Sequence, residues 1–312
     1  MTTLGQQLTE RATATDRPLA SLIRQHTLDG LLRRLANSTQ ASRFLLRGGL
    51  LTRAWLGPER RTTDDADFLG LFPRDVEEAL GRLGAPTWFR LGDRDMATHI
   101  RRTELLRGGA RLTDVMQGLA AALGVRARLL PMCDETVATK VRTPEGLLDF
   151  QDYFVRRHHA DRVLGLEFAG IEQARVTPEV RAALGAASTI VLCPSNPFVS
   201  LGPLRAVPGM NELLRESGAP LVAVSPIVAG QALRGPAAEM LAALGHEVSA
   251  LGVAKLYQNL VRGFVLDEAD RALVPAVEAL GLRVLVTATV MTSPDDRRRL
   301  ASDTLAFAET LR

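Results

Sequence analysis

Apolar runs and amphipathic segments alternate along the last third of the chain. The apolar runs lie at 189–194 (TIVLCP), 220–226 (PLVAVSP), 263–269 (GFVLDEA) and 283–291 (RVLVTATVM). The segments between them have the spacing of helices and lie at 210–218, 236–245 and 273–281. Such alternation predicts βαβ units, with parallel strands buried between helices on both faces of one sheet.

The preceding residues have a different texture. Helical spacing is present at 22–36, and an amphipathic helix is expected to begin at Thr113 and to end at Gly124. Strand-like runs follow at 126–132 (RARLLPM), 136–143 (TVATKVRT) and 147–155 (LLDFQDYFV). The sequence therefore predicts an α/β fold: a doubly wound, mostly parallel sheet forming an incomplete Rossmann-like core, with a helical insertion and an N-terminal α/β appendage. We expect two domains, 1–75 and 76–312.

Composition narrows the class of protein. The chain has 312 residues, 46% of them hydrophobic, and it contains no apolar run of the length needed to span a bilayer. The polar start, MTTLGQQLTERATATDR, lacks the apolar core of a signal peptide, so we expect a cytoplasmic protein without a membrane partner. Cys133 and Cys193 form neither a disulfide framework nor a zinc pattern.

Charge favours a small anionic ligand over a nucleic acid. The net charge is +3, and only 4% of the residues are aromatic. A protein that binds single strands needs aromatic rings interleaved with basic residues, and the sequence contains no such stretch. We therefore expect no nucleic-acid partner.

The first of the apolar runs stops abruptly in the Pro-Ser-Asn-Pro turn of residues 194–197. Ligands of open α/β sheets bind beyond the carboxyl ends of the strands, so Ser195 and Asn196 are candidates for binding an anion. Ser225 ends the next apolar run in the same way and gives a second hydroxyl. The alternative is two ordinary turns, because Ser, Asn and Pro favour turns for local reasons.

Long segments of the chain from residue 76 onward closely resemble the 2-phospho-L-lactate transferase family of deazaflavin-coenzyme biosynthesis. The matching segments, in family order, are PTWFRLGDRDMATHIRRTELLRGGARLTDV, LPMCDETVATKV, DFQDYFVRR, CPSNPFVSLGP, AVPGMNELL, VAVSPIVAGQALRGPAAEM and GHEVSALGVAKLY. The resemblance implies transfer of a phospholactyl or phosphoenolpyruvyl group from a guanosine diphosphate-linked donor to the deazaflavin precursor Fo, releasing GMP. It also implies Mg²⁺ or a similar divalent cation, and a homodimer.

The same resemblance assigns residues to the two substrates. The residues expected at the nucleotide are Pro194, Ser195, Asn196, Pro197, Phe198, Ser200 and Ser225. The residues expected on the Fo side are Arg90, Asp93 and Thr98, with Asp95 and His99 as the catalytic pair. For the two aspartates the alternative is helix-start chemistry, because carboxylates at a helix N-terminus cap it and oppose its dipole.

The front of the chain departs from that family, since it lacks the GGxGG-type turn, the NTxDD segment and the Ser-Pro-Asp-x-Asp segment. Residues of about 22–76 instead resemble nucleotidyltransferase toxins of abortive-infection systems, through Gly48 and Gly49 followed by Asp65 and Asp67. Alternate residues of a strand face one side, so the two aspartates could hold a divalent cation together. The alternative is a structural fragment without chemistry.

Three hypotheses follow from these resemblances. The first is a phospholactate-type transferase whose activity is impaired by the missing front. The second is a metal-dependent nucleotidyltransferase that uses Asp65 and Asp67, and a third carboxylate beside them would favour it. The third is a non-catalytic fusion or binding protein, which a gap in the sheet at the place of the first family strands would favour.

Overall fold

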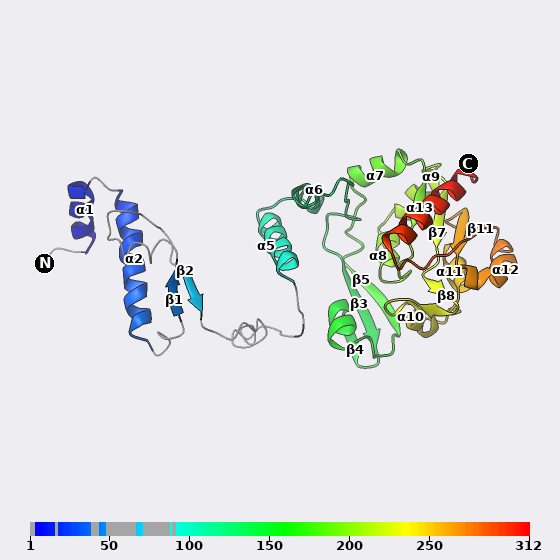
Figure 1. The fold of residues 1–312 in the computed structure, drawn as a ribbon, viewed down its shortest axis with the longest axis horizontal. Helices are drawn as coiled ribbons and strands as arrows, with labels where there is room; N and C mark the ends of the chain where they lie inside the picture. Colours follow the sequence, from blue (N-terminus) through cyan, green and yellow to red (C-terminus); the bar gives the residue numbers. More distant parts are fainter. Residues whose placement is uncertain (1–3, 16–17, 39–43, 48–66, 71–87, 89–91) are drawn as a thin grey trace. The chain divides into compact units, whose positions relative to one another are not determined.

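A four-stranded parallel sheet forms the centre of the larger part of the chain (Figure 1). The structure is a computed structural model, and it describes residues 4–15, 18–38, 44–47, 67–70, 88 and 92–312. The chain divides into two compact units, Met1–Thr87 and Trp88–Arg312, and each is described by itself. The division expected at 75/76 stays a prediction.

The first unit contains two helices and a two-stranded ladder in its described residues. Helix α1 (Leu4–Thr15) packs against α2 (Leu19–Ala36). Helix α2 contains residues 22–36, where the sequence has helical spacing. Strands β1 (Phe44–Arg47) and β2 (Asp67–Gly70) pair in antiparallel fashion, with Arg47 opposite Asp67.

The parallel sheet of the second unit has the spatial order β11-β10-β7-β6. Its strands are β6 (Ile190–Leu192), β7 (Leu221–Val224), β10 (Gly263–Leu266) and β11 (Arg283–Val286). All four lie within the predicted apolar runs, and every residue of β7 and β10 is buried. Parallel strands that are covered on both faces have this continuous apolar composition. The predicted α/β fold class is confirmed.

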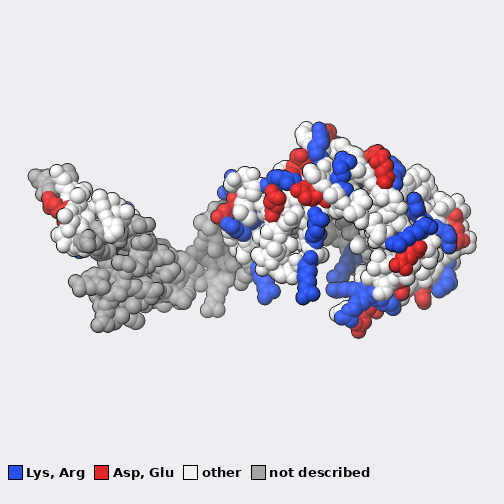
Figure 2. All heavy atoms as spheres, turned by 90° about the horizontal axis from the view of Figure 1, so that it is seen from above, with Lys and Arg blue, Asp and Glu red and all other residues white. Residues whose placement is uncertain are grey.

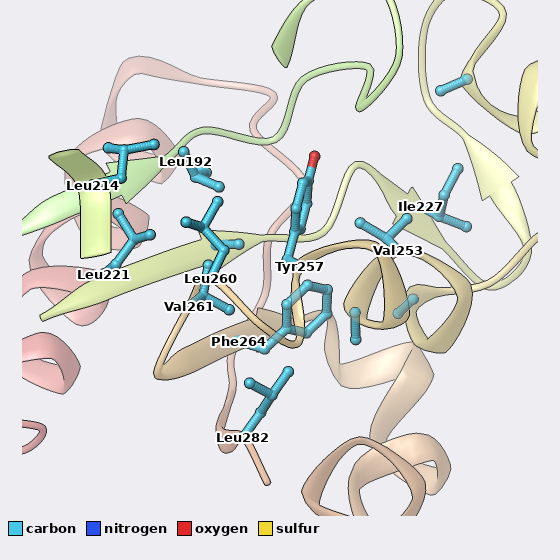
Figure 3. Close-up of a cluster of buried hydrophobic side chains, with 14 of the residues drawn as sticks. Leu192, Leu214, Leu221, Ile227, Val253, Tyr257, Leu260, Val261, Phe264 and Leu282 are labelled. Carbon is cyan, nitrogen blue, oxygen red and sulfur yellow. The ribbon is translucent and has the colours of Figure 1, made fainter. Parts of the chain in front are cut away.

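Helices cover both faces of this sheet. On one face, Leu221, Ala223 and Phe264 belong to a buried cluster with Leu241 and Tyr257. Figure 3 shows Leu221, Tyr257 and Phe264 in this cluster. The helices of that face are α8 (Leu201–Ala206), α9 (Met210–Glu216), α10 (Ala237–Ala243), α11 (Ala250–Tyr257) and α12 (Val274–Glu278).

Helix α13 (Pro294–Glu309) covers the opposite face, where Leu300 and Ala308 pack on Val222, Val224 and Val265. The order of the strands in the sheet is the same as their order in the sequence. When every right-handed crossover moves to the next strand on the same side, all the connecting helices lie on one face of the sheet. Helix α13 follows the last strand, so it is not a crossover and can cover the other face.

A smaller antiparallel sheet, order β4-β3-β5, precedes the parallel one. Its strands are β3 (Ala138–Thr143), β4 (Gly146–Asp149) and β5 (Gly165–Ala169). Between β4 and β5 the chain forms the π-helix η2 (Asp152–Arg156). The strand expected over 147–155 is therefore wrong in its second half, and the strand expected at 126–132 is absent, since those residues are irregular.

Helices α5 (Asp93–Arg107) and α6 (Leu112–Ala122) form the predicted helical insertion and pack against each other. The helix was expected to begin at Thr113, but α6 begins one residue earlier, at Leu112, with Arg111 as its N-cap residue. Thr113 is fully buried, and its N–H and hydroxyl both donate to Asp134 Oδ1 at 2.7 Å. A carboxylate distant in sequence therefore caps this helix.

The remaining elements are α7 (Pro178–Gly185), the two-residue strands β8 (Ile227–Val228) and β9 (Gln231–Ala232), and the 3-10 helix η3 (Glu268–Leu273). A helical segment was expected at 236–245, and α10 lies within it. The segment after Ser225 first forms the β8–β9 hairpin, whose turn residues Ala229 and Gly230 have φ values of 49° and 75°. In the described part of the chain, no helix has the length and apolarity needed to cross a membrane.

Candidate functional site

The loop after β6 is built around the side chain of Asn196. Its Oδ1 accepts hydrogen bonds from the backbone N–H groups of Phe198 (2.9 Å) and Val199 (3.3 Å). Its backbone carbonyl accepts from the N–H groups of Ser200 and Leu201, so the loop leads directly into α8. This turn is the reason why Asn suits the position, since its short side chain can replace a backbone acceptor.

Asn196 thus shapes the loop, whereas two neighbouring hydroxyls remain available to a ligand. Within the described residues, the hydroxyls of Ser195 and Ser200 have no hydrogen-bond partner, and Ser200 is exposed. Pro197 is buried below them and Pro194 is half-buried. The structure therefore brings Ser195 and Ser200 onto one short loop at the carboxyl end of the parallel sheet.

Phe198 joins this loop to the antiparallel sheet. Its half-buried ring packs both on the core of the parallel sheet and on the cluster of Val141, Tyr153 and Met240. The loop is fastened further because Asn196 Nδ2 donates to the Met240 sulfur at 3.4 Å. The site thus lies where the two sheets of the second unit meet.

Ser225 lies at the carboxyl end of β7, but its side chain is used within its own turn. The residue is 2% exposed, and its hydroxyl donates to the Ile227 carbonyl (2.8 Å) and accepts from the Ile227 N–H (3.1 Å). The structure gives Ser225 the role of closing the turn that precedes the β8–β9 hairpin.

Two buried carboxylates at the end of β10 were missed by the sequence analysis. Burial raises the pKa of Asp267, but hydrogen bonds from the N–H groups of Ala269 and Thr289 outweigh it and leave the pKa below its usual value. Burial and the charge of Asp267 raise the pKa of Asp270, whose two oxygens accept from the Ala229 N–H. The position of Asp267 directly after the apolar strand β10 is the sequence signal that could have identified it.

The Fo-side residues lie on or before α5. Arg90 is outside the described residues. Helix α5 begins at Asp93, so Asp93 and Asp95 lie in its first turn, where the alternative interpretation places them. Asp95 and His99 are exposed, and the Thr98 hydroxyl donates to the Arg94 carbonyl at 2.8 Å. Among the described elements α5 packs chiefly on α6.

An open depression of about 630 Å³ lies on the antiparallel sheet and η2. Its lining residues are Trp88, Ala138, Thr139, Asp149, Phe150, Gln151, Asp152 and Arg156. The Phe150 ring stacks on Phe154 with centroids 5.5 Å apart, which holds one aromatic wall in place. The family resemblance of this DFQDYF segment implied no role for its residues.

The described residues contain no group of three His, Cys, Asp or Glu side chains that could hold a metal ion. Asp65 is outside the described residues, and only the backbone of Asp67 is described, at the start of β2. The site that these two aspartates were expected to form therefore lies outside the described residues.

Positive and negative side chains are interspersed on the face shown in Figure 2. Arg111 is the clearest case of pairing, since its guanidinium bonds to both oxygens of Glu179 (2.9 and 3.1 Å) and to Asp134 (2.8 Å). Hydrogen bonds from Arg111 lower the pKa of Glu179 to about 2. This network joins the start of α6 to α7 and supports the fold.

A parallel sheet with hydroxyl-bearing loops at its carboxyl edge is typical of α/β proteins that bind phosphorylated small molecules. Residues 72–285 match the family described as 2-phospho-L-lactate transferase CofD. The chain is 40% identical over 234 residues to the 2-phospho-L-lactate transferase of Methanosarcina barkeri, covering 75% of each chain. It is also 40% identical over 243 residues to the phosphoenolpyruvate transferase of Streptomyces griseus, covering 76% of each.

The chain belongs to the 2-phospho-L-lactate transferase CofD family, a family of transferase enzymes. A crystal structure of protein BH3568 from Bacillus halodurans is a more distant neighbour, with 16% identity, a TM-score of 0.48, and coverage of 66% of this chain and 70% of that one. For the expected resemblance to nucleotidyltransferase toxins we find no support, and it stays a prediction.

Proposed function

We propose that this protein transfers a phospholactyl or phosphoenolpyruvyl group from a guanosine diphosphate-linked donor to the deazaflavin precursor Fo, with release of GMP. The relatives divide between two names, 2-phospho-L-lactate transferase and phosphoenolpyruvate transferase, so the proposal keeps both the phospholactyl and the phosphoenolpyruvyl group. In the reaction an Fo hydroxyl attacks the phosphorus that carries the lactyl or enolpyruvyl group. A new P–O bond forms, and the P–O bond to GMP breaks.

The observation that supports the donor site is the pair of hydroxyls on the loop after β6, for which the described residues provide no hydrogen-bond partner. Ser195 and Ser200 lie on the loop that follows β6, at the carboxyl end of the parallel sheet. Asn196 fixes the path of this loop between them. Pro194, Pro197 and Phe198 give the loop its shape and its apolar base. Hydroxyls of this kind can donate hydrogen bonds to the oxygens of a diphosphate.

The depression lined by Trp88 and Phe150 supports the acceptor site. A flat, conjugated ring system such as that of Fo gains most of its affinity from aromatic walls, and Gln151 and Asp152 at the same depression can fix its polar edges. Phe150 and Phe198 pack on one cluster, so the acceptor and donor sites share a wall. The roles proposed for Arg90, Asp93, Thr98, Asp95 and His99 rest on family resemblance.

We include Mg²⁺ in the proposal, although the described residues provide no set of ligands for it. Asp267 and Asp270, two buried carboxylates that follow β10, accept hydrogen bonds from backbone N–H groups. We therefore derive no step through the ion. The proposal also includes a cytoplasmic location, a homodimer, and no nucleic-acid or membrane partner. Light scattering of the purified protein tests whether it is a dimer.

Calorimetric titration with GDP and with Fo, with and without magnesium, tests the proposed function. GDP is expected to bind, and Ser195→Ala to weaken that binding. Ser188→Ala is the matched control, because Ser188 is an exposed serine before the amino end of the same strand. No GDP binding by the wild-type protein, or equal weakening by both variants, would contradict the proposal.

A second candidate is a protein that binds the nucleotide without turnover. The observation that favours it is the free edge of β6, because no described strand pairs with that side of the sheet. The family's first strands and Gly-rich turn are expected there, and their absence from the sequence predicts impaired activity. GDP binding without formation of product from donor and Fo would select this candidate. ATP binding that is lost in Asp65→Ala would select a nucleotidyltransferase instead.

A further inference from the structure

We infer that the imidazole of His246 donates a hydrogen bond to a phosphoryl oxygen of the guanosine diphosphate-linked donor. The inference rests on the proposed function and assigns one further contact to the same site. Nothing in the sequence pattern singled out His246, which lies in the turn between α10 and α11.

The turn that carries His246 lies beside the donor loop. The imidazole packs on the ring of Phe198, with centroids 5.5 Å apart and planes inclined by 31°. From the other side, a Cβ on Gly230 would lie 3.6 Å from the Val248 carbonyl, so the same turn also approaches the β8–β9 hairpin. The turn is therefore placed between the loops that follow β6 and β7, at the carboxyl edge of the sheet.

The imidazole nitrogens of His246 are available. Its backbone N–H is bound to the Leu241 carbonyl at 2.8 Å, but within the described residues neither ring nitrogen has a hydrogen-bond or ion-pair partner. The residue is half-buried, and Phe198 covers one face of the ring. Because packing on Phe198 fixes the orientation of the imidazole, His246 loses less conformational entropy when its free nitrogens bind a ligand.

The charges around His246 permit an anion. The nearest carboxylate in sequence, Glu247, is engaged by Lys255 (3.0 Å) and by the Ser249 hydroxyl (2.6 Å), so its charge is compensated. The carboxylates of Asp267 and Asp270 are buried and accept backbone N–H groups. The hydroxyls of Ser195 and Ser200 on the neighbouring loop supply further donors to the same oxygens.

Two variants separate the hydrogen bond from the packing. His246→Phe keeps an aromatic ring against Phe198 and removes the N–H, whereas His246→Gln keeps an N–H donor. We expect His246→Phe to weaken GDP binding about tenfold or more and His246→Gln by less than about threefold, since hydrogen bonds to charged groups have this magnitude. Guanosine, which has no phosphate, is expected to bind both variants as it binds the wild type.

Calorimetry of the full chain with GDP and guanosine measures these constants, and thermal unfolding checks that the variants are folded. His26→Phe is the control, because His26 is an exposed histidine on α2. Equal GDP affinity of the wild type and His246→Phe overturns the inference while the proposed function stands. Equal losses for GDP and guanosine also overturn it, because they would show a packing effect. Failure of the wild type to bind GDP overturns the proposed function itself.

Discussion

The side chain of Asn196 accepts the backbone N–H of Phe198 at 2.9 Å, and this bond sets the path of the loop between β6 and α8. We expect Asn196→Ala to lower the free energy of unfolding by about 1–3 kcal/mol, since two loop N–H groups lose their acceptor. The same variant should weaken GDP binding, because the hydroxyls of Ser195 and Ser200 lose their fixed positions.

Asn196→Asp is the matched variant, since it keeps an acceptor for the Phe198 and Val199 N–H groups. Urea unfolding and GDP titration of both variants check the prediction. If both variants lose the same stability, the acceptor at this position does not hold the loop.

Two helical glycines are expected to respond to alanine in opposite directions. A Cβ on Gly252 in α11 would overlap the backbone carbonyl oxygen of Glu247, and this clash requires the backbone to move. Gly252→Ala is therefore expected to lower the free energy of unfolding by more than about 2 kcal/mol. Gly118 in α6 has open space, so Gly118→Ala should raise it by about 0.5–1 kcal/mol through helix propensity.

Urea unfolding of the two glycine variants beside the wild type measures both effects. A loss of stability in Gly118→Ala, or no loss in Gly252→Ala, would contradict the packing described for these helices.

The parallel sheet was predictable because its two central strands, β7 and β10, are apolar throughout. In β7, Leu221 and Ala223 pack on one face and Val222 and Val224 on the other, so the sequence shows no alternation, as expected between two layers of helices. The place of the donor loop followed from the same pattern, since a Pro-Ser-Asn-Pro turn ends the first strand.

The rest depended on contacts that are distant in sequence. The start of α6 is fixed by Asp134. The strand-like run at 126–132 connects α6 to the antiparallel sheet without forming a strand. The π-helix η2 interrupts an apolar run that favours a strand. His246 meets Phe198 only through the fold, and no local pattern marks such a pair.

The start of α13 is expected to make the stability of the protein pH-dependent. Ser293 and Asp296 form a capping box, and hydrogen bonds from Thr292 and Ser293 lower the pKa of Asp296 to about 2. This value lies below the value of about 3.9 in an unfolded chain. The contribution is thus fully present above pH 4 and is lost as the pH falls through about 2.

We therefore expect Asp296→Ala to lower the urea midpoint at pH 7 and to differ less from the wild type at pH 2.5. Asp295→Ala is the control, since its side chain is 85% exposed and its ion pair with Arg298 is on the surface. A difference between Asp296→Ala and the wild type that stays constant from pH 7 to pH 2.5 would contradict the assignment.

The two cysteines should report directly on the donor loop. Cys193 is exposed at the carboxyl end of β6, directly before Pro194, whereas Cys133 is buried and its burial raises the pKa of the thiol. Because the thiolate is the reactive form, a small alkylating reagent at neutral pH should modify Cys193 rapidly and Cys133 only after unfolding. Intact mass spectrometry follows both additions, and Cys193→Ser should abolish the rapid one. GDP is expected to slow the rapid addition if the nucleotide occupies this loop. A rate that GDP leaves unchanged, under conditions where calorimetry shows it bound, would place the nucleotide elsewhere.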